Sequence, residues 1–540
     1  MRKLALLTVV IGLALCSCKT QNSSEMRTIS PEVLKDKIAG GWAGKMIGVT
    51  YGAPTEFKAQ GKTYDDSITW KPSDIVYSKW QDDLYVQLTF MMSMDEYGAD
   101  APAKKYQEMF AKAGYQLWHA NVQARKNYFD SIFPPQSGEP DYNFHADDID
   151  FQIESDYIGF MCPAMPRQAV KLADKVGHIM NYGEGYYGGV FVAALYAEAF
   201  FETDITKIIE YALRSIPAES DYYKIVKDVM LLHKQYPTDW KVAWNELEAK
   251  WGNVDICGAG STFNIDAKLN GAYIVMGLLY GEGDPYKTME ISTRCGQDSD
   301  CNPSNAMAVL GVMKGLKNLP AEMKTGVEAV GDSTFVNTNY SFNKAVENTY
   351  NYAIRFIKES GGEVTGKEIK IKNQQPVAPK FEDAFPKLVF DHKISIFDAK
   401  LWKTKGNWIT YKHKPWNQNE TKDQSKYGEK ADDELEFTFE GTGVTLMGNW
   451  VRDGGKADIY LDGKLHRTVD SYYFYSNQEH NDINLWHAFN LPQGNHTVRV
   501  VVKGEKRPES FGTRLYVTEA LIFRTAPKKS DSYKFSFQKS

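Results

Sequence analysis

The chain has 540 residues and a formal net charge of −6, and 13% of its residues are aromatic. This length exceeds what one hydrophobic core usually supports and therefore indicates two or three domains. The negative charge argues against a nucleic-acid-binding protein, because no basic stripe is available to displace the counterions of phosphate groups. The aromatic residues could equally fill protein cores or stack on sugar rings, so composition alone does not choose between these roles.

The first 17 residues have the pattern of a bacterial signal peptide. Arg2 and Lys3 precede an apolar run at 4–14 that is too short to span a bilayer. The run ends in Leu15-Cys16-Ser17-Cys18, which resembles a lipobox. Cleavage there would leave Cys18 as the lipidated first residue of an exported protein, with residues 18–30 as a tether; ordinary signal cleavage is the alternative. We expect anchoring to a bacterial membrane through this lipid alone, at the outer membrane on its periplasmic face or at the cell surface.

Residues 31–362 are predicted to form an all-α domain. Ser30, Pro31 and Glu32 suit a helix start, because Ser caps free N–H groups, Pro fits the first turn and an acid favours the positive end of the helix. Strand-like alternation is nearly absent from this part of the chain. Further helical patterns are expected at 84–94, 103–114, 167–175, 190–201, 205–216, 220–235, 239–251, 264–280, 285–293, 303–316, 321–330 and 342–358.

The periodicity changes to two after a Lys/Gln/Pro-rich segment at 363–390, which is predicted to be a linker. Residues 434–440 alternate strictly, 457–461 lead into an Asp462-Gly463 hairpin turn, and 496–502 and 515–523 have the pattern of further strands. The sequence therefore predicts a β-sandwich at 391–525, similar to galactose-binding or carbohydrate-binding modules, followed by a loose polar tail at 526–540. Its possible sugar platforms are Trp402, Trp408, Trp416, Trp450, Trp486, Tyr472, Tyr473 and Tyr475, of which half or more are expected in the core.

Acidic residues gather next to glycines at three places in the helical part. Glycines 40, 41, 44, 48 and 52 leave one helix face bare, so a partner can approach the backbone; the helix should end near Gly52, with Glu56 in the following loop. Gln81-Asp82-Asp83 precedes the helix at 84–94, where helix capping is the simpler explanation. Asp298-Ser299-Asp300-Cys301-Asn302-Pro303 places two carboxylates two residues apart, which suits two oxygen donors to one hard cation. We expect Asn302 to cap the next helix and Pro303 to begin it.

Taken in order, these motifs resemble the ADP-ribosylglycohydrolase family over about residues 31–350. The matches are Gly52-Ala53-Pro54-Thr55-Glu56, Asp82-Asp83, Asp298-Ser299-Asp300-Cys301-Asn302, and a Gly185-Tyr186-Tyr187-Gly188-Gly189 segment before an apolar helix. The resemblance implies an all-α fold with two Mg²⁺ ions in a central cleft.

The resemblance also implies roles for individual residues. Asp82, Asp83, Asp298 and Asp300 would be metal ligands, with Glu56 and Asp83 as the catalytic residues. Gln81 and Cys301 stand where the family has threonines; the amide oxygen could still coordinate, but a thiol is a poor ligand for magnesium, so one metal is expected to be weaker or absent. Asp156, Gly188, Gly189 and Asn302 are the candidate substrate-binding residues.

Two further groups of residues receive a simpler interpretation. The acidic run at 147–156 is expected to be a solvated loop, with substrate contact by Asp156 as the alternative. His145 and His178 are expected to be structural or surface residues, since this chemistry uses carboxylates. None of Cys162, Cys257, Cys295 and Cys301 forms a CxxC pair, which argues against a zinc site.

The resemblance and the export signal together favour a metal-dependent glycoside hydrolase that cleaves a glycan, with a furanoside as the favoured substrate. Two alternatives stay open. One is an ADP-ribosyl hydrolase that removes ADP-ribose from a modified acceptor. The other is a non-catalytic lipoprotein that binds sugars or nucleotides, which the changes at Gln81 and Cys301 motivate.

Overall fold

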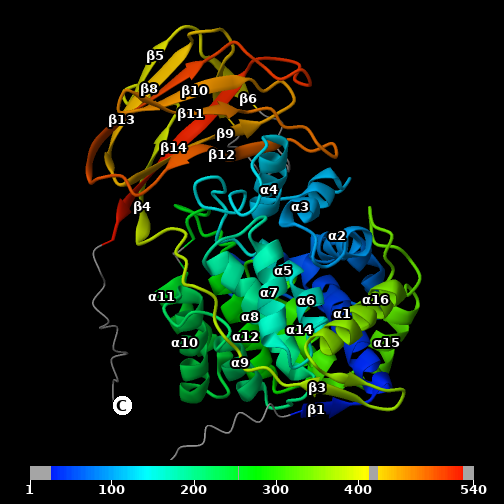
Figure 1. Cartoon of the computed structure of the whole chain (residues 1–540). Coiled ribbons are helices and arrows are strands. Elements are labelled where there is room, and N and C mark those ends of the chain that lie inside the picture. The colour runs from blue at the N-terminus through cyan, green and yellow to red at the C-terminus, as the bar shows by residue number, and fades with distance from the viewer. Residues whose placement is uncertain (1–25, 253–254, 413–423, 527–540) are drawn as a thin grey trace, which may run out of the picture.

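The computed structural model describes residues 26–252, 255–412 and 424–526. Its first part is a helical domain whose secondary structure follows the predicted pattern closely (Figure 1). The helices are α1 Pro31–Gly52, α2 Asp82–Tyr97, α3 Ala103–Lys112, α4 His119–Phe129, α5 Asp150–Glu154, α6 Asp156–Phe160, α7 Pro166–Gly177, α8 Glu184–Ala199, α9 Ile205–Leu213, α10 Asp221–Gln235, α11 Trp240–Trp251, α12 Ala267–Gly281, α13 Pro285–Arg294, α14 Cys301–Lys314, α15 Ala321–Glu328 and α16 Phe342–Glu359, with short 3₁₀ helices at Ala53–Thr55, Pro72–Trp80 and Leu316–Asn318.

Helix α1 begins as its sequence predicts. The Ser30 side chain accepts a hydrogen bond from the backbone N–H of Val33 at 3.2 Å, which satisfies one of the free N–H groups at the helix start. From Ile38 to Thr50 every residue of α1 is buried, so the helix runs through the domain interior rather than along its surface. Helices α8, α12 and α14 are buried over most of their length in the same way.

The closest helix pair in the domain is α1 with α14, and glycines line their contact. A Cβ atom added to Gly40, Gly44, Gly48 or Gly52 would lie 2.0–2.4 Å from a backbone oxygen of α14 or, for Gly52, of Ser299, two residues before that helix. Only glycine allows two helix backbones to approach this closely. The facing position on α14 is also glycine, since a Cβ on Gly311 would lie 2.0 Å from the Gly40 carbonyl oxygen.

The segment predicted to be a linker contains ordered strands at its start. Strands β2 Glu363–Val364 and β3 Ile369–Lys372 form a three-stranded antiparallel sheet with β1 Met26–Ile29, in the order β1-β3-β2. Ile369 and Ile371 are fully buried, which attaches this stretch to the helical domain. Further along, Glu382 contacts His178: the Nε2 atom of His178 lies 3.2 Å from Glu382 Oε1. The segment therefore packs along the helical domain instead of crossing open solvent.

The C-terminal part is a β-sandwich of antiparallel sheets, as the alternating pattern predicted (Figure 1). One sheet has the order β11-β10-β13-β8-β5 and the other β12-β9-β14-β7-β6, with β4 pairing to β14. The strands are β4 Leu388–Ser395, β5 Trp402–Lys405, β6 Ile409–Lys412, β7 Gln424–Gly428, β8 Glu434–Gly441, β9 Gly443–Trp450, β10 Lys456–Leu461, β11 Lys464–Asp470, β12 His480–Ala488, β13 Gly494–Val502 and β14 Leu515–Thr525. Asp462 and Gly463 both have positive φ angles, of 49° and 79°, as the expected hairpin turn requires.

The β-sandwich is joined to the helical domain around α4, which lies directly below β12 in Figure 1. The Gln478 side chain accepts a hydrogen bond from the backbone N–H of Leu117 at 3.1 Å and donates one to the Leu117 carbonyl oxygen at 2.9 Å. Tyr475 donates to the Lys112 carbonyl oxygen at 2.6 Å, and the Arg125 guanidinium lies 4.8 Å from the centre of its ring. These contacts join the two domains, and the two bonds of Gln478 are buried.

The aromatic residues proposed as sugar platforms divide into core residues, residues at the contact between the domains and residues on the surface. Trp402, Trp450, Trp486 and Tyr473 are at most 5% exposed and belong to the core of the sandwich, as expected for half or more of the set. Tyr475 faces the helical domain, and Trp416 lies outside the described residues. Of the eight, Trp408 and Tyr472 remain half-buried on the described surface.

We expect Gly48→Ala to destabilise the protein by about 1–3 kcal/mol, the usual range for overpacking, despite alanine's higher helix propensity. The added Cβ would lie 2.3 Å from the Pro303 carbonyl oxygen, so one of the two helices must shift. Chemical denaturation followed by circular dichroism measures the change. Gly366→Ala is the matched control, because nothing lies within 4 Å of its added Cβ. Equal stability of the two variants would contradict the tight contact of α1 with α14.

Candidate metal centre

Carboxylates from three distant segments meet at the ends of α1, α2 and α14. Ligand atoms of Asp83, Asp300 and Cys301 all lie within 4.8 Å of one another, and so do those of Glu56, Asp298 and Asp300. Asp300 belongs to both groups, so the two sets share one carboxylate. The convergence that the sequence predicted for these residues is therefore present in the structure. We call the set Glu56, Asp82, Asp83, Asp298 and Asp300 the acidic cluster.

Hydrogen bonds join the loop that follows α1 to the loop that precedes α14. The hydroxyls of Thr55 and Ser299 lie 2.7 Å apart, and the backbone N–H of Phe57 donates to the Gln297 carbonyl oxygen at 3.0 Å. The segment that carries Glu56 is thus bound to the segment that carries Asp298. Glu56 itself is exposed, whereas Asp298 and Asp300 are buried, which places Glu56 at the open side of the cluster.

The helix starts place the remaining carboxylates. Asp82 and Asp83 lie in the first turn of α2, where free N–H groups and the helix dipole favour negative charge. The N-cap of α14 is Asp300, not Asn302 as predicted, and Pro303 lies two residues inside the helix. The expected cap was wrong because Asn302 has another partner: its side chain donates to Asn270 Oδ1 at 3.1 Å. Asn302 is fully buried, and its contact with substrate stays a prediction.

Sequence reasoning missed Lys45, which supplies a positive charge inside the acidic cluster. This side chain is fully buried in α1, and its Nζ lies 2.8 Å from Asp83 Oδ1 and 3.2 Å from Asp156 Oδ2. It also donates to the Ile153 carbonyl oxygen at 2.8 Å. A buried ammonium is tolerated only with such partners. Lys45 is the only charged residue in the glycine-rich stretch 38–52 of α1, and this was the available signal.

Two residues, Cys301 and Gln81, depart from the family pattern. The Cys301 thiol is 3.1 Å from Asp83 Oδ2 and belongs to the first group of ligand atoms. Gln81 is half-buried as the N-cap of α2, and its backbone carbonyl accepts from Leu84 and Tyr85. Its side chain is adjacent to the acidic cluster in sequence, and its role as a ligand stays a prediction.

The donor set fits a hard divalent cation. Asp298 Oδ1 is buried and has no hydrogen-bond partner within the described residues, which is costly for a carboxylate oxygen unless a cation is bound. Carboxylate oxygens are the ligands that Mg²⁺ prefers in proteins. Asp82, Asp83, Asp298 and Asp300 would hold the ion or ions, and Lys45 offsets only part of their charge.

Mutual repulsion and burial raise the pKa values of these carboxyls. The charge of Asp300 and burial raise the pKa of Glu56 to about 9. Burial and the charge of Asp83 raise the pKa of Asp82 to about 8, and burial raises that of Asp300 to about 6. Without a cation the cluster therefore retains protons at neutral pH, and a bound cation would displace them.

The acidic run at 147–156 is not a solvated loop, contrary to the expectation. Asp147, Asp148, Asp150, Glu154 and Asp156 are all at most 5% exposed. Each carboxylate has partners from other segments; Asp150, for instance, accepts hydrogen bonds from the backbone N–H groups of Ala120 and Asn121. A run of acids gives no sign of such partners, since they come from distant parts of the chain.

Three predicted substrate-binding residues are buried and have partners within the helical domain. Asp156 is fully buried and bonded to Lys45, and it also accepts from Tyr196 Oη at 2.5 Å, so no surface remains for a substrate. Gly188 and Gly189 pack against α5: an added Cβ would lie 2.7 Å from Gln152 Oε1 and 2.2 Å from the Phe151 ring. These glycines allow close helix packing, which in sequence has the same appearance as a ligand-binding glycine pair.

Comparison with known proteins decides the family. The family model for ADP-ribosylglycohydrolases matches residues 30–350, more than half of the chain. The chain belongs to the ADP-ribosylglycohydrolase family. This membership supports a glycohydrolase-type function, and this family of hydrolases typically depends on divalent metals.

The other similarities found for this ADP-ribosylglycohydrolase are more distant. A curated relative, the A type blood alpha-D-galactosamine galactosaminidase of Flavonifractor plautii, is 29% identical over 98 residues, which cover 18% of this chain and 8% of that protein. The ADP-ribosylglycohydrolase-related protein complex is a solved structure with 13% identity and a TM-score of 0.43, covering 60% of this chain and 99% of the other. The CBM36-1 domain of a multidomain xylanase from the hindgut metagenome of Trinervitermes trinervoides has 18% identity and a TM-score of 0.17, covering 25% and 98%.

Three remaining features concern the cysteines, the predicted signal peptide and membrane-spanning helices. Cys162, Cys257, Cys295 and Cys301 are all free thiols. Cys18 and the rest of the predicted signal peptide lie outside the described residues. Among the helices that are described, none has the length and apolar character needed to cross a membrane.

We expect Lys45→Met to destabilise the protein by about 3–5 kcal/mol, because it leaves buried carboxylates without their counter-charge. Thermal and chemical denaturation measure the change. Lys35→Met on the same helix is the matched control: its pair with Glu347 is half-exposed on both sides and should contribute under about 1 kcal/mol. A loss for Lys45→Met no larger than the control's would refute a buried ion pair.

Stability in EDTA should fall as the pH rises from about 5 to 9. The carboxyls of Glu56, Asp82 and Asp300 have pKa values raised above those of the unfolded chain, so the folded state binds more protons in this window and loses that stabilisation as pH increases through their pKa values. Mg²⁺ should reduce the fall by replacing the protons. Melting temperatures across this range, with EDTA or with Mg²⁺, test the expectation; parallel curves would contradict it.

Proposed function

We propose that this protein is an exported, Mg²⁺-dependent glycoside hydrolase that cleaves a glycosidic bond in a glycan, with a furanoside as the favoured substrate. The observation that supports the proposal best is the acidic cluster itself: buried carboxylates from three segments meet beside one exposed carboxyl, Glu56. A protein that only bound sugars would have no need for such a costly group of acids.

Hydrolysis requires a water molecule to add to the sugar carbon while a proton passes to the leaving oxygen. Asp82, Asp83, Asp298 and Asp300 would hold Mg²⁺, which when bound would supply Lewis-acid chemistry that orients sugar hydroxyls and the attacking water. Asp300 belongs to both groups of ligand atoms, so both groups depend on this carboxylate. The negative charge that remains favours a transition state with positive charge on the sugar.

Glu56 is the residue we assign to proton transfer. It is the exposed member of the acidic cluster, so its carboxyl can reach both solvent and a bound substrate. Without a cation its neighbours raise its pKa to about 9. Bound Mg²⁺ would lower this pKa toward neutral pH, where a carboxyl can exchange a proton as a general acid or base. Asp83 was predicted to be catalytic as well, but it is fully buried and paired with Lys45. We therefore assign Asp83 to holding the cation.

Three observations favour a glycan over ADP-ribose as substrate. The β-sandwich is bound to α4 by buried hydrogen bonds, and such domains commonly accompany carbohydrate-active enzymes. The curated relative is a galactosaminidase, and the predicted export signal would separate the protein from intracellular ADP-ribosylated proteins. The family's name keeps ADP-ribosyl hydrolysis as the second candidate.

Digestion of a glycan panel, with an ADP-ribosylated peptide alongside, tests the proposal through the products released with Mg²⁺ or EDTA. We expect monosaccharide release that EDTA abolishes, and a loss of about 10²–10⁴-fold in kcat/KM for Glu56→Gln. Asp300→Asn should also lose Mg²⁺ binding in calorimetry. Glu328→Gln, an exposed glutamate on α15, is the control with unchanged activity.

Each other outcome has a defined meaning. Release that persists in EDTA would refute the metal mechanism. Release of ADP-ribose alone would establish the second candidate, and sugar binding without release of any product would identify a binding protein.

A further inference from the structure

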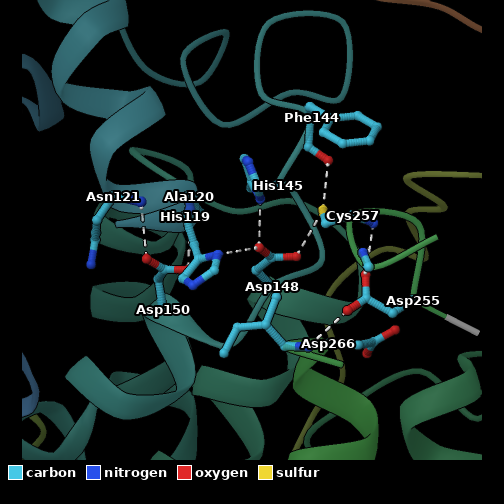
Figure 2. A network of polar contacts seen from close by, with 12 residues as sticks. His119, Ala120, Asn121, Phe144, His145, Asp148, Asp150, Asp255, Cys257 and Asp266 are labelled. Carbon is cyan, nitrogen blue, oxygen red and sulfur yellow. Dashed lines mark hydrogen bonds and ion pairs between the residues drawn. The ribbon is translucent and has the colours of Figure 1, made fainter. Parts of the chain in front are cut away.

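A second group of metal-ligand side chains, shown in Figure 2, shares no residue with the acidic cluster. The Nδ1 atoms of His145 and His119 lie 2.7 Å and 3.6 Å from the same oxygen, Asp148 Oδ2. Ligand atoms of these three residues are all within 4.8 Å of one another. Asp148 is fully buried, whereas 27% of the His119 side chain and 12% of the His145 side chain are exposed, so the group is open on the imidazole side.

The other oxygen of Asp148 is held from behind. The Cys257 thiol lies 3.1 Å from Asp148 Oδ1 and 3.2 Å from the Phe144 carbonyl oxygen. The loop that carries Cys257 is fixed in turn, because Asp255 accepts hydrogen bonds from the backbone N–H groups of Cys257, Gly258 and Ile265. Such outer bonds orient a ligating carboxylate in metal sites.

His119 is held in place under backbone strain. Its φ angle is 43°, in the left-handed region that a residue other than glycine rarely adopts. On one side, Gln478 of the β-sandwich binds both backbone polar groups of Leu117; on the other, Asp150 accepts from the N–H groups of Ala120 and Asn121. The surrounding structure thus directs this imidazole toward Asp148.

A third imidazole comes from the β-sandwich. His480 lies close enough to His119 and His145 to interact electrostatically with both. Its Nε2 atom is buried and has no hydrogen-bond partner within the described part of the chain. A further imidazole therefore lies near the two that contact Asp148, and its buried Nε2 is available to another partner.

We propose that His119, His145 and Asp148 form a second metal site, which binds one transition-metal dication such as Zn²⁺. Two imidazoles and one carboxylate are a donor set for zinc or non-haem iron, whereas the acidic cluster offers mainly hard oxygen donors that suit Mg²⁺. Ligand atoms around a tetrahedral zinc ion are roughly 3.3 Å apart, and the distances of 2.7 Å and 3.6 Å lie on either side of this value.

The remaining coordination position is open to a water molecule or an oxygen of a substrate, as in catalytic zinc sites with three protein ligands. Cys257 orients Asp148 as an outer partner. The sequence argument against zinc considered only CxxC pairs. It could not detect this site, because the ligands are histidines and an aspartate from α4 and from the loop before α5. The inference does not depend on the proposed hydrolase function.

The test is Zn²⁺ binding to the purified full chain after chelation, measured by competition with a chromophoric chelator in excess Mg²⁺. We expect one Zn²⁺ per chain in the wild type and in Asp300→Asn. His119→Ala should bind Zn²⁺ at least about 100-fold more weakly, and Cys257→Ala about 10–100-fold, as for other outer partners. His392→Ala, an exposed histidine of β4, is the matched control with unchanged affinity.

Circular dichroism in EDTA shows whether each variant folds, and Co²⁺ spectra of the wild type and His119→Ala report on nitrogen ligation without reference to activity. If wild type and His119→Ala bind Zn²⁺ equally, or if neither binds it, the three residues form only a structural hydrogen-bond network. Loss of Zn²⁺ in Asp300→Asn but not in His119→Ala would assign the ion to the acidic cluster. Either result overturns the proposal.

Discussion

The position of the acidic cluster depends on how closely the backbones of α1 and α14 approach. Glycines at four-residue spacing on α1 face backbone oxygens of α14, and any larger residue would force the helices apart. The last of them, Gly52, lies against Ser299 and Asp300, so the contact ends at the cluster itself. Glu56 and Asp300, far apart in the chain, are thereby placed within reach of the same cation. The same helix supplies Lys45, whose ammonium offsets part of the repulsion that this convergence creates.

Much of the fold could be predicted because its signals are local. Helix starts such as Ser30-Pro31, the periodicity of the helices, the alternation at 434–440 and the Asp462-Gly463 turn each depend on a few neighbouring residues. Helix α4 was missed because its face is not apolar: Arg125 and Lys126 are buried through bonds and ring contacts that come from elsewhere in the fold.

For the candidate site, the order of the motifs was sufficient to predict which carboxylates would meet. It could not show the roles that distant partners determine. Asp156 is bonded to Lys45 and Tyr196, and Gly188 packs on Gln152; neither contact leaves a trace in the local sequence. His145 was expected to be a structural or surface residue, and its position beside His119 at Asp148 again depends on a partner from a distant segment.

The bonds from Gln478 and Tyr475 to the backbone beside α4 also define what kind of accessory module the β-sandwich is. Many carbohydrate-binding modules swing on flexible tethers and raise the local concentration of polymer without choosing its direction. Here the β-sandwich is bonded to the helical domain in one orientation. If the sandwich binds a glycan, as the proposed function implies, it would present that glycan to the helical domain from one fixed direction. It would then set the orientation of the polymer as well as its local concentration.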